Sequence, residues 1–112
     1  MLPKKNRISK ELFRELFPKG RGAHSRVVLL KIVPINEKDT RFAFVVPSKT
    51  AKKAVDRNKL KRRARYITAK LLPFIKTGVA VIVFFKKGAE KLNFKELEKE
   101  IGDIYRKAGI LQ

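Results

Sequence analysis

The sequence predicts an α+β domain in which helices cover a small sheet. Two runs, residues 41–46 and 79–85, are nearly all apolar and indicate strands buried on both faces. A long segment between them has apolar residues at helical spacing, and a second such segment follows residue 93. The 112 residues, 44% of them hydrophobic, can form one core, so residues 1–112 are predicted to be a single domain.

The elements follow in the order αββαβα. A first helix is expected over residues 10–17, with Ser9 as its cap and Pro18 and Gly20 ending it. The pattern predicts a loop over 19–25, strands over 26–33, 41–46 and 79–85, and a turn over 34–40. The long helix ends near residues 72–73, and the last helix runs from its cap, Asn93, to Gly109.

Charge is the extreme feature of the composition. The chain has 29 Lys and Arg against 10 Asp and Glu, a net charge of +19. Solubility does not require such an excess, so it favours a polyanionic partner, nucleic acid before an anionic membrane. Residues 49–65 alone carry nine basic side chains and one acid, which gives +8. The binding surface is expected to centre there.

The composition also excludes several classes of chemical site and of protein. The absence of Cys excludes disulfides, thiolate zinc sites and Cys nucleophiles, and a single His excludes a multi-histidine metal site. Residues 1–6 lack the apolar region of a secretory signal, and the longest apolar run, residues 79–85, is too short to span a membrane. A membrane-active cationic helix is disfavoured because strands accompany the helix and no Trp is present. A cytoplasmic protein with no membrane partner is expected.

The long helix separates a core stripe from a basic face. Leu60, Ala64, Ile67 and Leu71 form the stripe. Beside it, an arc of about 140° at 100° per residue holds Arg57, Lys61, Arg65, Asn58 and Arg62, while Lys59, Arg63 and Lys70 lie on the opposite flank. Arg donates paired hydrogen bonds to phosphate, and an Asn amide can reach phosphate, a 2′-hydroxyl or a base edge. Acids are nearly absent from this helix, which favours a binding surface over the alternative of an ordinary solvated face.

These residues carry a family resemblance. Residues 57–65, RNKLKRRAR, resemble the signature helix of the bacterial ribonuclease P protein subunit, roughly R-N-R-x-K-R-x-x-R. The preceding AVD of residues 54–56, the FVVPSK of residues 44–49, and an N-terminus with KNRI at residues 5–8, Phe13, Phe17 and Gly20 are similar to that family as well. The resemblance covers essentially the whole chain. This sequence departs from the family pattern at three positions. Lys59 stands where the family usually has Arg, Lys52 where a Gly is expected, and Gly88 where a Pro is common.

The resemblance implies a fold and a function. The fold is a compact two-layer sandwich of order αβββαβα, similar to a ribosomal-protein domain, with an unusual left-handed βαβ crossover; residues 20–25 are a candidate place for the additional short strand. The function is that of a ribonucleoprotein endonuclease that removes the 5′ leader of precursor tRNA. The implied partners are the ribonuclease P RNA and precursor tRNA, with no protein partner required. In that family the RNA is the catalyst and binds the Mg²⁺ ions, so no catalytic or metal-binding residue is expected in this chain.

Site residues follow from the pattern and the resemblance together. Arg57, Asn58, Lys61, Arg62, Arg65 and Lys49 are expected to bind the catalytic RNA. Phe13 and Phe17, at i,i+4, can stack single-stranded bases, and the resemblance favours them as the lining of a cleft for the precursor leader. A core-facing role for this pair stays open, because Leu12 and Leu16 form a second stripe about 100° away. Lys86 and Lys87 are expected to contact phosphates beside the cleft.

The residues themselves argue against protein-based catalysis. Hydrolysis by a protein needs clustered carboxylates or a His, but only five acids lie in residues 1–78 and they are scattered. The acids of the last helix are interleaved with basic residues and are expected in ion pairs such as Asp103–Lys107. His24 has no evident partner. A ribosomal or other structural RNA-binding protein without a catalytic complex stays the alternative function.

Overall fold

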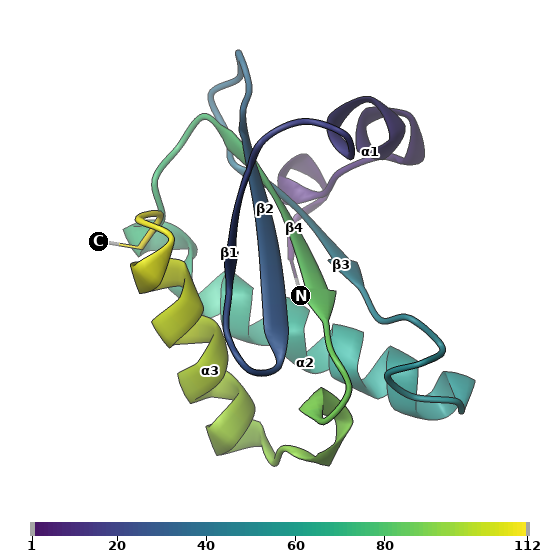
Figure 1. The fold of residues 1–112 in the computed structure, drawn as a ribbon. Helices are drawn as coiled ribbons and strands as arrows, with labels where there is room; N and C mark the ends of the chain where they lie inside the picture. The colour runs from purple at the N-terminus through teal and green to yellow at the C-terminus, as the bar shows by residue number, and fades with distance from the viewer. Residues whose placement is uncertain (1, 112) are drawn as a thin grey trace.

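A four-stranded sheet of order β1-β2-β4-β3 forms the centre of the computed structural model, which describes residues 2–111 (Figure 1). The strands are β1 Arg21–His24, β2 Val28–Pro34, β3 Arg41–Val45 and β4 Val79–Phe85. β2 is antiparallel to β1 and β4, whereas β3 is parallel to β4. Parallel neighbours need a crossover connection, which helix α2 (Ala54–Leu71) supplies. The left-handed sense of this crossover stays a prediction.

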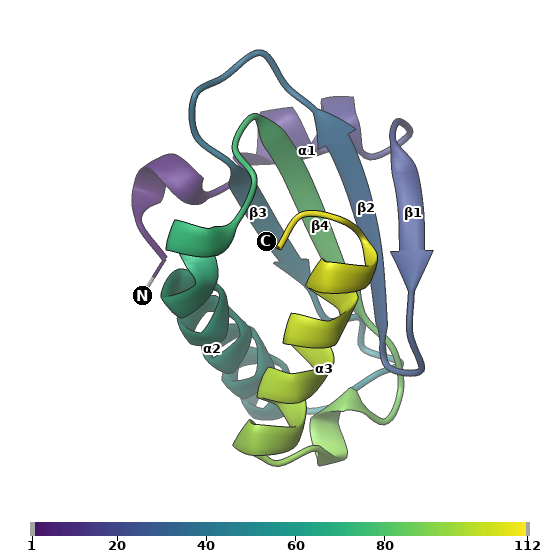
Figure 2. The same cartoon turned by 90° about the vertical axis from the view of Figure 1, so that its left-hand side faces the viewer.

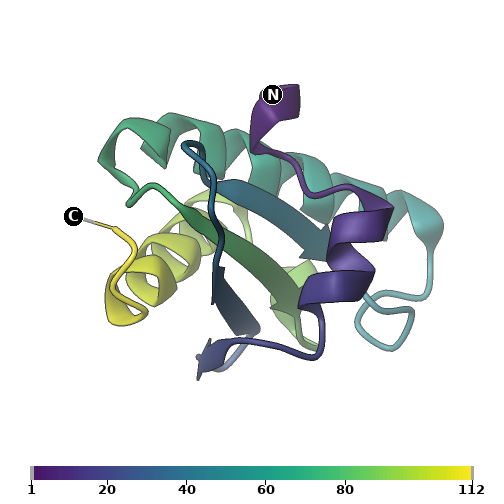
Figure 3. The same ribbon diagram turned by 90° about the horizontal axis from the view of Figure 1, so that it is seen from above.

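Helices cover both faces of the sheet. α2 and α3 (Phe94–Lys107) lie side by side on one face, and α1 (Lys10–Leu16) lies on the other (Figures 2 and 3). The order is therefore αβββαβα, and the expected class is confirmed. The additional strand is β1, within the segment that periodicity alone assigns to a loop. Three 3-10 turns, Lys4–Asn6, Leu72–Phe74 and Ala89–Lys91, join the elements.

Two apolar clusters hold the layers together. On the larger side, Leu60, Ala64 and Ile67 of α2 are buried against the sheet and α3, as the helical pattern predicts. On the smaller side, Leu16 of α1 packs with Ala80 of β4, Ile82 and Val33. β4 contributes to both clusters and is buried on both faces, which confirms the prediction for that strand.

β3 differs from its prediction, because it is an edge strand rather than one buried on both faces. Phe42 is buried, but Ala43, Phe44 and Val45 are only half-buried. The N-terminal segment approaches the outer edge, where the Ile8 amide donates a 2.9 Å hydrogen bond to the Phe42 carbonyl. Partial cover by this segment and by α1 explains why an edge strand is so apolar.

Side chains begin the first and last helices as predicted. Ser9 Oγ accepts a 3.1 Å hydrogen bond from the Leu12 amide. Asn93 and Glu96 form a reciprocal capping box at the start of α3. At the other end of α3, Gly109 has a φ of +80°, a left-handed conformation that favours glycine.

The ion pairs on α3 differ from the predicted pair of Asp103 with Lys107. Asp103 pairs with Lys99 at 2.8 Å and Arg106 at 3.2 Å, not with Lys107. The hydrogen bond from Lys99 lowers the pKa of Asp103. Lys107 instead donates a 3.0 Å hydrogen bond to the carbonyl of His24 on β1. The C-terminal end of α3 is thereby joined to the β1 edge.

Candidate nucleic-acid interface

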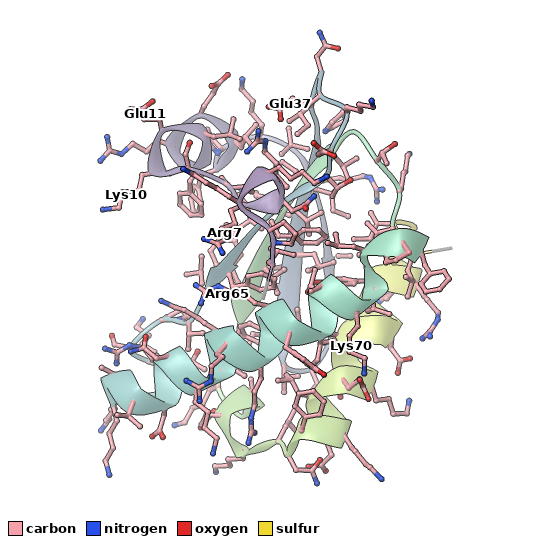
Figure 4. All side chains as sticks on the ribbon, turned by 180° about the vertical axis from the view of Figure 1, so that it is seen from behind. Arg7, Lys10, Glu11, Glu37, Arg65 and Lys70 are labelled. Carbon is pink, nitrogen blue, oxygen red and sulfur yellow. The ribbon has the colours of Figure 1, made fainter. Side chains whose placement is uncertain are left out.

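The basic face of α2 includes Arg65, which Figure 4 shows on the edge of the helix away from Lys70. Lys61 and Arg65 are half-buried, while Asn58 and Arg62 are exposed. Of the five ion pairs among residues 2–111, none uses Lys61, Arg62 or Arg65. These positive charges are therefore available to an external anion.

The other cations of α2 lie on the opposite flank, toward α3 and the 3-10 turn Ala89–Lys91. Figure 4 shows Arg65 and Lys70 projecting from opposite edges of the helix, Lys70 toward α3. Lys70 Nζ lies 3.1 Å from Glu98 Oε2. Lys59 and Arg63 line a small hollow together with Asp56 and Glu90. The helix thus carries two groups of cations, and the acids Asp56, Glu90 and Glu98 lie beside the group of Lys59, Arg63 and Lys70.

Arg57 has a structural task that the sequence did not indicate. One of its guanidinium nitrogens, Nη1, donates hydrogen bonds to the carbonyls of Ala51 at 2.9 Å and Lys52 at 2.7 Å. Lys53, at the N-cap position of α2, provides no side-chain cap. Arg57 therefore fixes the turn into α2, and its phosphate contact stays a prediction that must be met by its remaining N–H donors.

Lys49, Lys86 and Lys87 lie near one another at one end of the molecule. The buried Thr50 donates a 2.7 Å hydrogen bond from its hydroxyl to the Phe85 carbonyl, which joins the Lys49 loop to the end of β4. Lys86 is half-buried and its ammonium donates to the Ser25 carbonyl at 2.8 Å, whereas Lys87 is exposed. Of the two, Lys87 is therefore the better placed for a phosphate.

The aromatic pair of α1 divides between core and surface. Phe13 is half-buried against the smaller apolar cluster, and Phe17 is 45% exposed. Their ring centroids are 5.5 Å apart, and the Phe17 ring meets Phe84 of β4 edge-on at 5.8 Å. Leu16, 4% exposed, takes the core position. The surface position of Phe17 is the one that base stacking requires.

Sequence reasoning missed three residues on the sheet face beside Phe17, namely Lys31, Leu29 and Phe84. Lys31 Nζ lies 4.7 Å from the Phe17 ring centroid and donates to the Phe17 carbonyl. Leu29 is exposed and stands opposite Phe84 in the β2–β4 register. A signal was present, because a lysine interrupts the apolar run of β2 and side chains two apart share a face.

Phe13 also lines a groove between α1 and β3, and this groove together with the adjoining Phe17 is called the aromatic cleft. The groove, of about 370 Å³, is lined by Lys10, Phe13 and Arg14 of α1 and by Ala43, Phe44 and Val45 of β3. It offers apolar walls and two cations at its rim. These are the features that a single-stranded nucleic acid needs, since its bases stack and its phosphates are anionic.

Among residues 2–111, no three His, Cys, Asp or Glu side chains lie close enough to hold a metal ion together. None of the helices in that part of the chain has both the length and the apolar character to cross a membrane.

A basic α+β protein with a cationic helix face beside an aromatic cleft belongs to the class of RNA-binding domains. The family model described as Ribonuclease P matches residues 2–109. The chain therefore belongs to the ribonuclease P protein family, which acts in tRNA processing and works with the ribonuclease P RNA.

Relatives and solved structures agree. The ribonuclease P protein component of Pseudanabaena sp. is 36% identical over 99% of this chain and 97% of its own length, and that of Syntrophomonas wolfei is 32% identical over 98% and 92%. A solved Staphylococcus aureus RNase P protein mutant with defective mRNA degradation activity superposes with a TM-score of 0.88 at 23% identity, covering 96% of this chain and 92% of its own. The Thermotoga maritima RNase P protein superposes with a TM-score of 0.76 at 23% identity, covering 84% of this chain and 89% of its own. The ribosomal alternative is not favoured.

Proposed function

We propose that this chain holds two RNAs at once. The ribonuclease P RNA lies on the basic face of α2, with Lys49 at its end, and the 5′ leader of precursor tRNA lies in the aromatic cleft. The hydrogen bond from Thr50 to Phe85 carries this proposal, because it brings the loop before α2 to the strand that contains Phe84 and is followed by Lys86 and Lys87. The two surfaces are therefore adjacent.

In this proposal the protein contributes binding rather than chemistry. Arg62 and Arg65 neutralise phosphates of the catalytic RNA through charge-assisted hydrogen bonds. Phe17 stacks on a leader base, which only the precursor possesses, so the complex prefers precursor over mature tRNA. The result is assisted endonucleolytic removal of the leader.

We place the catalytic centre and its Mg²⁺ ions in the RNA subunit. Mg²⁺ prefers oxygen ligands from carboxylates and phosphates. A chain of net charge +19 repels free cations and attracts phosphates, which suits a scaffold for RNA. We also infer that the activity is cytoplasmic and needs no second protein, since both proposed ligands are RNA.

Reconstitution at low Mg²⁺ tests the proposal. Ribonuclease P RNA and precursor tRNA are mixed with and without this protein, and cleavage is followed over a range of Mg²⁺ concentrations. We expect the protein to lower the Mg²⁺ needed for cleavage, because its cations replace some of the ions that screen RNA phosphates. Unchanged cleavage at every Mg²⁺ concentration would contradict the proposal.

A further inference from the structure

Tyr66 is a large aromatic side chain on the solvent side of the basic helix. It is 52% exposed and lies one turn after Arg62, just beyond the border of the basic face. A single exposed apolar residue is ordinary on a protein surface. What distinguishes Tyr66 is the way its ring is held.

Contacts from α3 and from the next turn of α2 fix the ring. The Phe94 ring lies 5.9 Å from the Tyr66 ring, centroid to centroid, at an interplanar angle of 60°. The Lys70 ammonium lies 5.7 Å from the Tyr66 ring centroid and is itself bound by Glu98 at 3.1 Å. The ring is therefore oriented in the free protein, while half of its surface stays open. An aromatic group that is already ordered loses little entropy when a ligand covers it.

The surroundings of the ring favour an anion that also carries flat apolar groups. Arg62 stands at i−4 and is exposed, and Lys95, next to Phe94, is exposed on α3. Two acids of α3 are already engaged, since Glu98 pairs with Lys70 and Glu96 takes part in the capping box. A nucleic acid satisfies both features, because its bases stack on aromatic rings and its phosphates pair with Arg and Lys.

We propose that Tyr66 is a stacking platform for an unpaired base of the ribonuclease P RNA, whose adjoining phosphate is bound by Arg62. The proposal rests on the proposed function, since it assigns a contact to the same RNA. It extends the interface from the basic face of α2 toward the α2–α3 border. Lys70 acts through the ring as a positioning residue.

Affinity titrations at several salt concentrations test the platform. The probe is the ribonuclease P RNA without substrate, and the variants are Tyr66→Ala, Tyr66→Phe and Arg62→Ala. Tyr66→Ala should weaken binding about 5- to 150-fold, the range of one lost base stack. The slope of log K against log salt should stay unchanged, because no phosphate contact is lost. Arg62→Ala should flatten that slope by roughly 0.7–0.9, and Tyr66→Phe should bind within about twofold of the native chain.

Phe74→Ala is the matched control, because Phe74 is 56% exposed and lies beyond the end of α2. It should bind the RNA within about twofold of the native chain. Equal losses for Tyr66→Ala and Phe74→Ala, or a Tyr66→Ala variant that binds as well as the native chain, would overturn the platform. Thermal melts of each variant establish that the folded state is what binds. If the native chain itself fails to bind the RNA, the proposed function fails rather than the platform alone.

A spectroscopic measurement reads the contact directly. The chain has two tyrosines, of which Tyr105 is fully buried and Tyr66 is exposed, so a 3-fluorotyrosine-labelled protein gives one ¹⁹F resonance from each. The resonance that disappears in Tyr66→Phe belongs to Tyr66. Addition of the RNA should shift this resonance, because a stacked base places its ring current on the label, and should leave that of Tyr105 in place. Equal shifts of both, or none, would contradict the platform.

Discussion

Leu16 and Phe17 are chain neighbours with opposite environments. Leu16 is 4% exposed in the smaller apolar cluster, and Phe17 is 45% exposed in the cleft. Successive residues of a helix point about 100° apart, so burying one at this position turns the other outward. The pair therefore allows core and binding effects to be measured separately.

Replacing Phe17 with Ala should weaken precursor tRNA binding by roughly 1–3 kcal/mol, because a base loses its stacking partner. Binding of mature tRNA by the complex should hardly change, since it lacks the leader. Competitive binding assays with the two RNAs give the comparison. The matched core variant, Leu16→Ala, should instead lower the free energy of unfolding by about 2–5 kcal/mol. A Phe17→Ala variant that loses affinity for both RNAs and melts early would show that Phe17 is a core residue.

The sequence could not decide between these two stripes of α1. A helical wheel shows that Phe13 and Phe17 share one face and Leu12 and Leu16 another, but either face can meet a sheet. The decision depends on how α1 docks on Ala80 and Ile82, a contact between residues more than 60 positions apart. Lys31 escaped notice for the same reason, since its role depends on where Phe17 lies.

At the scale of the element, α2 should bind RNA from one side. Arg62→Ala and Arg65→Ala should each cost on the order of 1–3 kcal/mol of affinity for the catalytic RNA, through lost charge-assisted hydrogen bonds. Lys59→Ala and Arg63→Ala remove the same charge from the opposite flank of the helix and should cost only a few tenths of a kcal/mol, as exposed charges do. Titrations of the four variants at equal salt measure this. Overlapping losses in the two groups would mean that the helix binds through undirected charge.

Arg57 needs a different comparison within the same helix, because it closes the turn before α2. Arg57→Lys keeps the charge but cannot reproduce the forked donor geometry. We expect a lower melting temperature with an unchanged dependence of RNA affinity on salt. If the melting temperature stays the same, the two carbonyl hydrogen bonds contribute nothing to the turn.

The contact between α2 and α3 contains a buried polar pair. The hydroxyls of Thr68 and Tyr105 are 2.8 Å apart, and neither side chain is exposed. Burial raises the pKa of Tyr105 above its ordinary 10.0, only partly opposed by the hydrogen bond with Thr68. A phenol with a raised folded-state pKa contributes fully to stability below pH 10, and this contribution is lost as the pH rises further.

Tyr105→Phe should therefore have two effects on the free energy of unfolding. At pH 7 the free energy of unfolding should fall by about 1 kcal/mol, because the Thr68 hydroxyl loses its hydrogen-bond partner. Above pH 10 the native chain should lose up to about 1.4 kcal/mol per pH unit from this group, and the variant should lack that contribution. Urea titrations across pH measure both effects. Identical alkaline profiles would show that Tyr105 ionises as readily in the folded state as in the unfolded one.

Element by element, periodicity was most reliable where burial was complete. β4, buried on both faces, has the predicted bounds, and α3 begins at the predicted cap. β1 could not be found this way, because its burial pattern is mostly exposed and it is held by pairing with β2. The prediction that β3 is buried on both faces is wrong. β3 is an apolar edge strand covered from outside by the N-terminal segment, and such a strand has the composition of a central strand.

For the whole molecule, a net charge of +19 opposes folding through self-repulsion. An anion that binds only the folded state adds RT ln(1 + [L]/Kd) to the free energy of unfolding. Millimolar sulfate or pyrophosphate should therefore raise the melting temperature, by about 4 °C for each kcal/mol gained. Chloride at equal ionic strength is the control for general screening. Equal melting temperatures in sulfate and chloride would argue against a preformed anion site.

The strand order has a consequence for the chain as it leaves the ribosome. β4 is the last strand to be synthesised, yet both β2 and β3 take it as their hydrogen-bonded neighbour. A nascent chain that ends before Val79 can form the β1–β2 hairpin, while β3 has no strand to join and α2 no sheet to cover. Such an intermediate exposes an unpaired apolar edge, the surface on which chains aggregate. Protease resistance in stalled nascent chains should thus arise in one step, once β4 has emerged.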